Sequence, residues 1–272
     1  MDNRPIGIFD SGTGGLTSVR QLTAEAPEES FVFFGDTIRA PYGGRSPEEI
    51  RFLSRRNARF LRSRDVKAII VSCNTSTANA MAELKADNRD IPIVGTVEPT
   101  AEEAVRRSVT GRIGVMATEA TVRSGLYERT ILALRPDAVV VSRSCPKLVP
   151  LVETGHTAPE DPALKAALEE DMAPLREAGV DTVVLGCTHY PLISEAILAA
   201  LGYPAELVDS GAACVGRVLE ALKARDALAA PGSARAERYF CSGRKNEFLS
   251  VAGSFLGRSI DGDTAEVDIE GI

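Results

Sequence analysis

Two cysteines of this chain stand in nearly the same sequence context. Cys73 follows the apolar run 68–72 and precedes Asn-Thr, and Cys187 follows the run 182–186 and precedes Thr-His. Each run is typical of a β-strand and each cysteine is followed by a helical pattern, so both thiols are predicted where a strand ends and a helix begins. Because a helix N-terminus stabilises an anion, we expect the pKa of each thiol to fall from about 8.5 toward neutrality. Two such thiols suggest a substrate held between them.

A second internal similarity supports a chain built from two related parts. The segment 6–11 reads Ile-Gly-Ile-Phe-Asp-Ser and the segment 113–118 reads Ile-Gly-Val-Met-Ala-Thr, at an offset close to that between the two cysteines. Asp10 and Thr118 therefore also fall at the carboxyl ends of predicted strands, where parallel α/β sheets bind their ligands. We interpret the chain as two halves that face one site.

Apolar runs alternate with amphipathic helical patterns along the sequence, which predicts an α/β fold. We expect two pseudo-symmetric α/β domains with mostly parallel sheets and the active site between them. The first domain is predicted to comprise residues 1–97 plus 208–272, and the second residues 98–207. The predicted strands are residues 6–9, 31–34, 68–72, 91–95, 112–116, 138–142, 182–186, 205–208 and 237–241.

Composition limits the classes of function. The 272 residues carry a formal net charge of −7, which argues against a nucleic-acid partner because binding phosphates requires a basic face. Strand-like sequence begins at Ile6, leaving no room for a secretion signal, and no apolar run approaches the roughly 18–20 residues of a membrane-spanning helix. Five widely spaced cysteines, an odd number, fit free thiols in a reducing compartment. We therefore expect a soluble, cytoplasmic protein without membrane contact.

The glycine-rich turn at residues 10–15 does not fit a dinucleotide site, because the third glycine of that fingerprint would fall at Thr17. The turn is interpreted instead as a place where backbone N–H groups approach a carboxylate or a similar anion. Asp10 would then face the site as a polar partner. Its alternative role is the N-cap of the following helix.

His189 and Glu153 are further candidates for the site. Cys187 and His189 lack the paired spacing of zinc ligands, so no metal is expected. His189 either makes a hydrogen bond within its turn or assists the neighbouring thiol in proton transfer. Glu153, in a loop flanked by proline and glycine, is taken alone as a solvated acid. The remaining cysteines, which lack the setting of the first two, are interpreted as structural: Cys145, Cys214 and Cys241.

A set of short motifs is spread over most of the chain. They are Phe9-Asp10-Ser11-Gly12, Gly35-Asp36-Thr37 with Pro41-Tyr42-Gly43, Cys73-Asn74-Thr75, Ala117-Thr118 with Thr121-Val122, Val149 to Glu153, Gly186-Cys187-Thr188-His189-Tyr190-Pro191, and Val208-Asp209-Ser210-Gly211. Together, in this order, they resemble the glutamate racemases of the aspartate/glutamate racemase superfamily. The resemblance implies two α/β domains related by pseudo-twofold symmetry, and racemisation without pyridoxal phosphate, metal or nucleotide.

The resemblance also implies roles for individual residues. Cys73 would deprotonate D-glutamate with support from Asp10, and Cys187 would deprotonate L-glutamate with support from Glu153 and His189. The residues implied to hold the ammonium and carboxylates of the substrate are Asp10, Ser11, Tyr42, Gly43, Asn74, Thr75, Thr118, Thr121, Thr188 and His189. Inverting one carbon needs a base on one face and an acid on the other, a task that two opposed thiols can share.

Other functions remain open at this point. The related aspartate racemases share paired cysteines, whereas the loop 41–43 and the segment 186–191 favour glutamate. D-Glutamate would supply peptidoglycan synthesis in a bacterial cytoplasm, and we expect a homodimer. A rival interpretation from another class is a two-lobed solute-binding or regulatory module, which would explain the internal similarity but not two thiols at matching strand ends.

Overall fold

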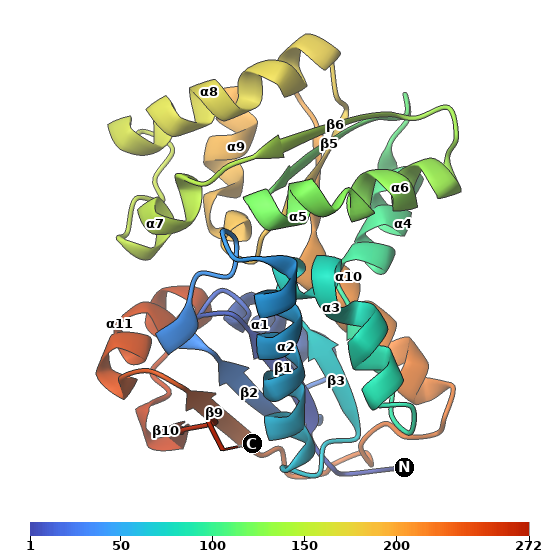
Figure 1. Ribbon diagram of the computed structural model, residues 1–272, viewed down its shortest axis with the longest axis vertical. Helices are drawn as coiled ribbons and strands as arrows, with labels where there is room; N and C mark the ends of the chain where they lie inside the picture. Colours follow the sequence, from blue (N-terminus) through green and yellow to red (C-terminus); the bar gives the residue numbers. More distant parts are fainter. Residues whose placement is uncertain (272) are drawn as a thin grey trace.

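Two parallel β-sheets organise the computed structural model, which describes residues 1–271 (Figure 1). The first sheet has the strand order β10-β9-β2-β1-β3-β4, and the second has the order β6-β5-β7-β8. The first sheet consists of β1 (Ile6–Asp10), β2 (Phe31–Gly35), β3 (Ala68–Val71), β4 (Ile93–Gly95), β9 (Glu237–Cys241) and β10 (Thr264–Glu266). The second sheet consists of β5 (Arg112–Ala117), β6 (Val139–Ser144), β7 (Thr182–Gly186) and β8 (Glu206–Asp209).

The two sheets share one topology. In each, four successive strands lie in the order second, first, third, fourth, which is β2-β1-β3-β4 in one and β6-β5-β7-β8 in the other. This arrangement confirms the predicted α/β fold with two mostly parallel sheets. Because β1 corresponds to β5 and β3 to β7, the residues that follow these strands lie at equivalent positions on the two sheets.

Helices cover both faces of each sheet, with an apolar core on each face. On the first sheet, α1 (Leu16–Glu25), α10 (Ser210–Lys223) and α11 (Lys245–Leu256) lie on one face, and α2 (Pro47–Arg62) and α3 (Asn74–Asp87) on the other. On the second, α4 (Val97–Arg107) and α6 (Leu126–Leu134) lie on one face, and α7 (Leu148–Glu153), α8 (Pro162–Ala178) and α9 (Ser194–Leu201) on the other. Short helices complete the chain: α5 (Glu119–Ser124) and 3₁₀ turns at Thr37–Arg39, Tyr190–Ile193 and Asp261–Asp263.

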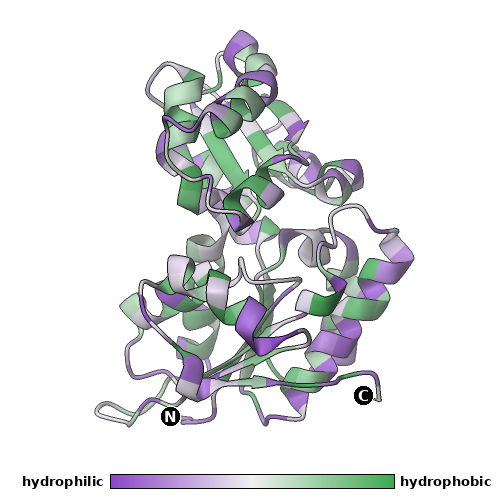
Figure 2. Cartoon of the chain, turned by 90° about the vertical axis from the view of Figure 1, so that its left-hand side faces the viewer, coloured by the Kyte–Doolittle hydropathy of each residue, from purple (hydrophilic) through white to green (hydrophobic). Residues whose placement is uncertain are grey.

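The burial of both sheet faces accounts for the sequence pattern. Figure 2 shows hydrophobic strands inside each lobe and helices that carry both hydrophobic and hydrophilic residues outside. Strands buried on both faces give continuous apolar runs, which made most of them predictable. None of the helices within residues 1–271 is both long and apolar enough to cross a membrane.

Three features differ from the sequence-based expectations. β10 lies outside the predicted strands, because three residues are too short for a periodic pattern and the strand forms by pairing with β9 at the sheet edge. β8 pairs with β7 through Asp209, so the predicted domain boundary at 208 falls inside a strand, and the division of the chain stays a prediction. The helix expected after Cys187 starts as a 3₁₀ turn, Tyr190–Ile193, with Pro191 near its beginning, and the α-helix α9 begins only at Ser194 because Ile193 departs from helical geometry.

The chain crosses between the two sheets twice. The first crossing is at Thr96, between β4 and α4, and the second is where β8 ends at Asp209 and α10 begins at Ser210. The Asp209 carboxylate caps α10 by accepting a hydrogen bond from the N–H of Gly211 at 2.7 Å. α4 and α10, which start at the two crossings, pack against each other.

A buried ion pair joins the amino ends of two strands. Lys67 Nζ lies 2.6 Å from Glu29 Oε2 just before β3 and β2, and both side chains are buried. We expect Lys67→Met to lower the free energy of unfolding by about 3–5 kcal/mol, because the Glu29 carboxylate would stay buried without its partner. Urea unfolding measures this loss. Arg55→Ala breaks the exposed pair with Asp87 and should cost far less; equal losses in the two variants would contradict the prediction.

Candidate active site

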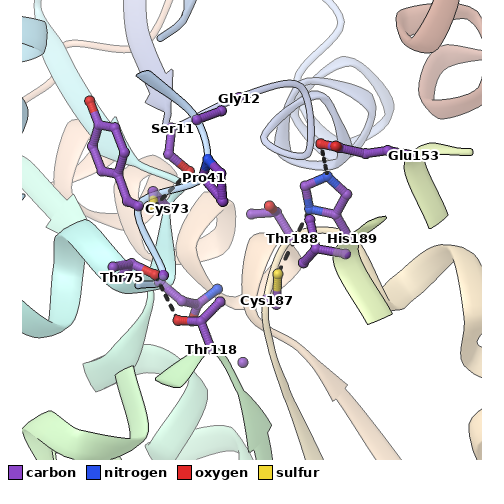
Figure 3. Close-up of a pocket in the computed structure, with 16 residues that line it drawn as sticks. Ser11, Gly12, Pro41, Cys73, Thr75, Thr118, Glu153, Cys187, Thr188 and His189 are labelled. Carbon is purple, nitrogen blue, oxygen red and sulfur yellow. Dashed lines mark hydrogen bonds and ion pairs between the residues drawn. The ribbon is translucent and has the colours of Figure 1, made fainter. Parts of the chain in front are cut away.

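A small cavity lies between the two lobes, at the carboxyl ends of their central strands (Figure 3). The first lobe lines it with residues 11–12, 40–43 and 73–75, and the second with Thr118, Val149, Glu153 and residues 186–189. The cavity volume is about 40 Å³. Because one water needs roughly 10–15 Å³, this space holds only a few water molecules, and a larger ligand can enter it only when the lobes or the lining move.

Cys73 faces the cavity from the first lobe (Figure 3). It is the N-cap of α3, and its sulfur accepts a hydrogen bond from the Ser76 N–H at 3.4 Å, while its thiol donates to Ser11 Oγ at 3.4 Å. Burial, together with the nearby Asp10 carboxyl group, nevertheless raises the pKa of Cys73 to about 11. The expected lowering of this pKa is therefore wrong, because the hydrogen bonds at the helix start are outweighed. Cys73 keeps its proton at neutral pH.

Asp10 ends β1 and is buried beside this thiol without lining the cavity. Its Oδ2 accepts a hydrogen bond from the Gly12 N–H at 3.0 Å, and its Oδ1 has no hydrogen-bond partner within residues 1–271. Burial raises the pKa of Asp10. The N-cap alternative is wrong, because α1 begins at Leu16 with Gly15 as its N-cap. Asp10 therefore lies behind the lining of the cavity.

Cys187 faces the cavity from the second lobe and is followed by a hydrogen-bonded chain of side chains (Figure 3). Its Sγ lies 3.8 Å from His189 Nδ1, and His189 Nε2 lies 3.0 Å from Glu153 Oε1. Burial alone would lower the pKa of His189, but its hydrogen bonds to Cys187 and Glu153 prevail and raise it to about 10. A protonated His189 donates from both ring nitrogens, and a cation at this position stabilises negative charge on sulfur.

Three threonine hydroxyls meet where the lobes touch. Thr75 Oγ1, at the start of α3, lies 2.8 Å from Thr118 Oγ1, which follows β5. Thr118 Oγ1 lies 2.9 Å from Thr121 Oγ1 on α5. A hydroxyl can donate or accept, so these groups could exchange their mutual hydrogen bonds for bonds to a carboxylate. Thr121 stands one layer behind the cavity, which it does not line.

The loop between β2 and α2 also bridges the lobes. Its Gly43 carbonyl accepts a hydrogen bond from the Ala120 N–H of α5 at 2.9 Å. The Tyr42 ring is buried, its hydroxyl donates to Asp36 Oδ2 and it accepts from Asn57 Nδ2 at 3.1 Å. Because this hydroxyl is already engaged within the first lobe, Tyr42 is left to contact a ligand through its ring or its main chain.

Most of the residues singled out in the sequence lie together around this cavity. Asp10 and Thr121 do not line it, whereas the others do. The lining residues that the sequence analysis did not single out are Gly12, Ala40, Pro41, Val149 and Gly186. All but Ala40 lie inside the quoted motifs, so membership of a motif was a usable signal. Ala40 carries no chemical signal in the sequence.

Cys187, His189 and Glu153, which line the cavity, are of residue types that can bind metal ions. Within the described part of the chain, no group of three or more His, Cys, Asp or Glu side chains is arranged to hold a metal ion. The Cys187, His189 and Glu153 side chains instead bind one another in a row.

Comparison with known proteins assigns the chain to a family. The model of the Asp/Glu/hydantoin racemase family matches residues 16–218, which include both cysteines and all the threonines described above. The chain belongs to this family. The match extends over both sheets, except for β1, β9 and β10 of the first sheet.

Relatives within the family match over nearly the whole chain. The glutamate racemase of Desulforudis audaxviator is 44% identical over 95% of this chain and 96% of its own length. The glutamate racemase of Geobacter metallireducens is 42% identical over 99% of this chain and 98% of its own length. The crystal structure of Francisella tularensis glutamate racemase in complex with D-glutamate superposes with a TM-score of 0.93, at 30% identity and complete coverage of both chains. The racemase fold is thus present from end to end.

Proposed function

We propose that this protein interconverts L- and D-glutamate by a two-thiol acid/base mechanism that needs no cofactor. The observation that carries the proposal is the pair Cys73 and Cys187, which follow equivalent strands of the two sheets and line one cavity from opposite lobes. Family membership and full-length similarity to glutamate racemases support the choice of substrate. A binding module of the solute-binding class would have no need of this pair.

The two sides of the cavity differ in the groups that stand beside each sulfur. Cys73, with a pKa of about 11, is a thiol and can donate a proton. On the other side, a protonated His189 stabilises the Cys187 sulfur when it carries negative charge. In the L-to-D direction, Cys187 removes the α-proton and Cys73 delivers its own to the opposite face. In the D-to-L direction the two thiols exchange roles, and Asp10 supports Cys73.

The carbanion between these two steps needs oriented hydrogen-bond donors, because no cofactor supplies an electron sink. The main-chain N–H groups of Asn74 and Thr75, the first two residues of α3, have no partner within the helix and point toward its cavity end. We assign the ammonium and carboxylates of glutamate to these groups, to Thr121 behind the lining, and to the polar lining itself: Ser11, Gly43, Asn74, Thr75, Thr118 and Thr188. Water is excluded by the closeness of the lobes, which strengthens each of these interactions.

The cellular role follows from the proposed product. D-Glutamate is a building block for peptidoglycan, so we propose a role in cell-wall synthesis in the cytoplasm. The expected homodimer stays a prediction, which light scattering of the purified protein would check.

Incubation of purified protein with L-glutamate, followed by chiral chromatography, tests the proposed function. We expect D-glutamate to accumulate until the two enantiomers are equal, and the same end point from D-glutamate. Activity should survive dialysis against a chelator, because the proposal uses no metal. L-Aspartate in a parallel reaction tests the alternative substrate. Binding of glutamate without any conversion would favour the solute-binding module and refute the proposal.

The pH dependence of kcat/KM tests the proposed role of His189. The Glu153 carboxylate is one of the two partners that raise the pKa of His189 to about 10, so Glu153→Gln should lower that pKa. The His189 ring then loses its proton at a lower pH than in the parent protein. We expect the alkaline limb of kcat/KM for L-glutamate to move down by about one pH unit or more. A pH–rate profile measures the shift, and Glu195→Gln on the exposed side of α9 is the control. An unmoved limb would remove His189 from the mechanism.

A further inference from the structure

We propose that Asn74, which follows Cys73 in the chain, is a positioning residue. Its side chain binds both crossings between the lobes and thereby holds the lobes closed on the substrate. The inference rests on the proposed function for its kinetic readout. It assigns to Asn74 a task beyond contact with the substrate.

The Asn74 amide connects three separate segments of the chain. Its Oδ1 accepts hydrogen bonds from Tyr127 Oη at 2.7 Å and from Thr96 Oγ1 at 2.9 Å, and its Nδ2 donates to Ser210 Oγ at 2.9 Å. Thr96 is the first crossing between the lobes, Ser210 begins the helix after the second, and Tyr127 lies on α6 of the second lobe. One amide group therefore binds both crossings and the opposite lobe.

Burial makes these hydrogen bonds obligatory. Asn74, Thr96, Ser210 and Tyr127 are all buried, with at most 3% of any residue exposed. An amide oxygen has two lone pairs, so Tyr127 and Thr96 together occupy the acceptor fully. A buried polar group that loses its partner is costly, because no water replaces the bond. The geometry of the crossings is therefore coupled to the position of Asn74.

A second contact ties the first crossing to the same helix. The Thr96 N–H donates to Thr77 Oγ1 at 3.2 Å, one turn after Asn74 on α3. Two side chains of α3 thus hold Thr96: Asn74 binds its hydroxyl and Thr77 binds its main-chain N–H. Movement of the crossings away from α3 would break both bonds and enlarge the cavity between the thiols.

This coupling predicts a particular kinetic signature. If the closed arrangement binds substrate, a variant that populates it less should bind more weakly in proportion to the lost population. Substrate at saturation still draws the lobes into the same closed form, so the maximal rate should be little changed. A buried hydrogen bond changes such an equilibrium by a factor of about three to ten.

Tyr127→Phe removes one of the three hydrogen bonds without touching the cavity lining. We expect KM to rise about three- to tenfold in both directions while kcat stays within about twofold. Tyr203→Phe is the matched control, because that hydroxyl donates only to the Leu175 carbonyl within the second lobe, at 3.4 Å, among the described residues. Thr96→Val should raise KM in the same way as Tyr127→Phe, and Thr96→Ser, which keeps the hydroxyl, should restore the parent value.

A readout that does not depend on catalysis separates this inference from the proposed function. Cys73 and Cys187 are buried, so their alkylation by iodoacetamide, followed by peptide mass spectrometry, reports opening of the lobes. Both thiols should react several-fold faster in Tyr127→Phe and Thr96→Val than in the parent or Tyr203→Phe. A lower melting temperature with unchanged KM and unchanged alkylation would overturn the inference. If the parent protein does not racemise glutamate, the proposed function fails while the alkylation rates still decide this inference.

Discussion

Cys73→Ser and Cys187→Ser are each expected to lower racemisation by about a thousandfold in both directions, which is the scale of general acid/base catalysis. Each thiol serves as the base in one direction and as the acid in the other, so neither direction can proceed without both. A hydroxyl is a far weaker acid than a thiol. Chiral chromatography of the product after long incubation measures the residual rate. Cys241→Ala, on β9 away from the cavity, should stay within a few fold of the parent.

Isotope labelling distinguishes a mechanism with two bases from a mechanism with a single base. In D₂O the donating thiol carries deuterium, so early product should be deuterated at the α-carbon while unreacted substrate stays largely protonated, from either enantiomer. A single base acting on both faces would return its own proton and label both pools together. Equal early labelling of substrate and product, or substantial racemisation in either serine variant, would refute the two-thiol assignment.

Gly14→Ala is expected to lower kcat/KM by about a hundredfold while each lobe stays folded. Gly14 lies in the turn after β1, and a Cβ added there would overlap the Thr188 hydroxyl and lie 2.7 Å from ring atoms of His189 in the other lobe. Either the lobes stay apart or these side chains move, and a displacement of about 1 Å at a catalytic group costs on the order of a hundredfold. Steady-state kinetics in both directions measures the loss.

The control for this variant is Gly216→Ala. Gly216 lies inside α10, where an added Cβ would meet nothing within 4 Å, and alanine favours a helix over glycine by about 0.5–1 kcal/mol. Gly216→Ala should keep full activity and melt no lower than the parent. A Gly14→Ala protein with parental kcat/KM would show that the two lobes need not approach as closely as they do here.

The sequence by itself determined the fold class and most of the cavity lining. Strands buried on both faces of a parallel sheet must be apolar over their whole length, so their ends are visible as the points where polar residues begin. Cys73, Thr118 and Cys187 stand at such points, and parallel strands bring their carboxyl ends to one edge. The internal similarity then placed two such edges in one chain, which the shared strand order of the two sheets confirms.

Only the tertiary structure decided the protonation and the contacts of these residues. The raised pKa of Cys73 comes from its burial and from Asp10, which lies 63 residues earlier, and so could not follow from its place at a helix start. The raised pKa of His189 depends on Glu153, which a local reading treats as a solvated acid. Burial and long-range hydrogen bonds are set by how the two lobes pack together, and local sequence patterns do not contain that information.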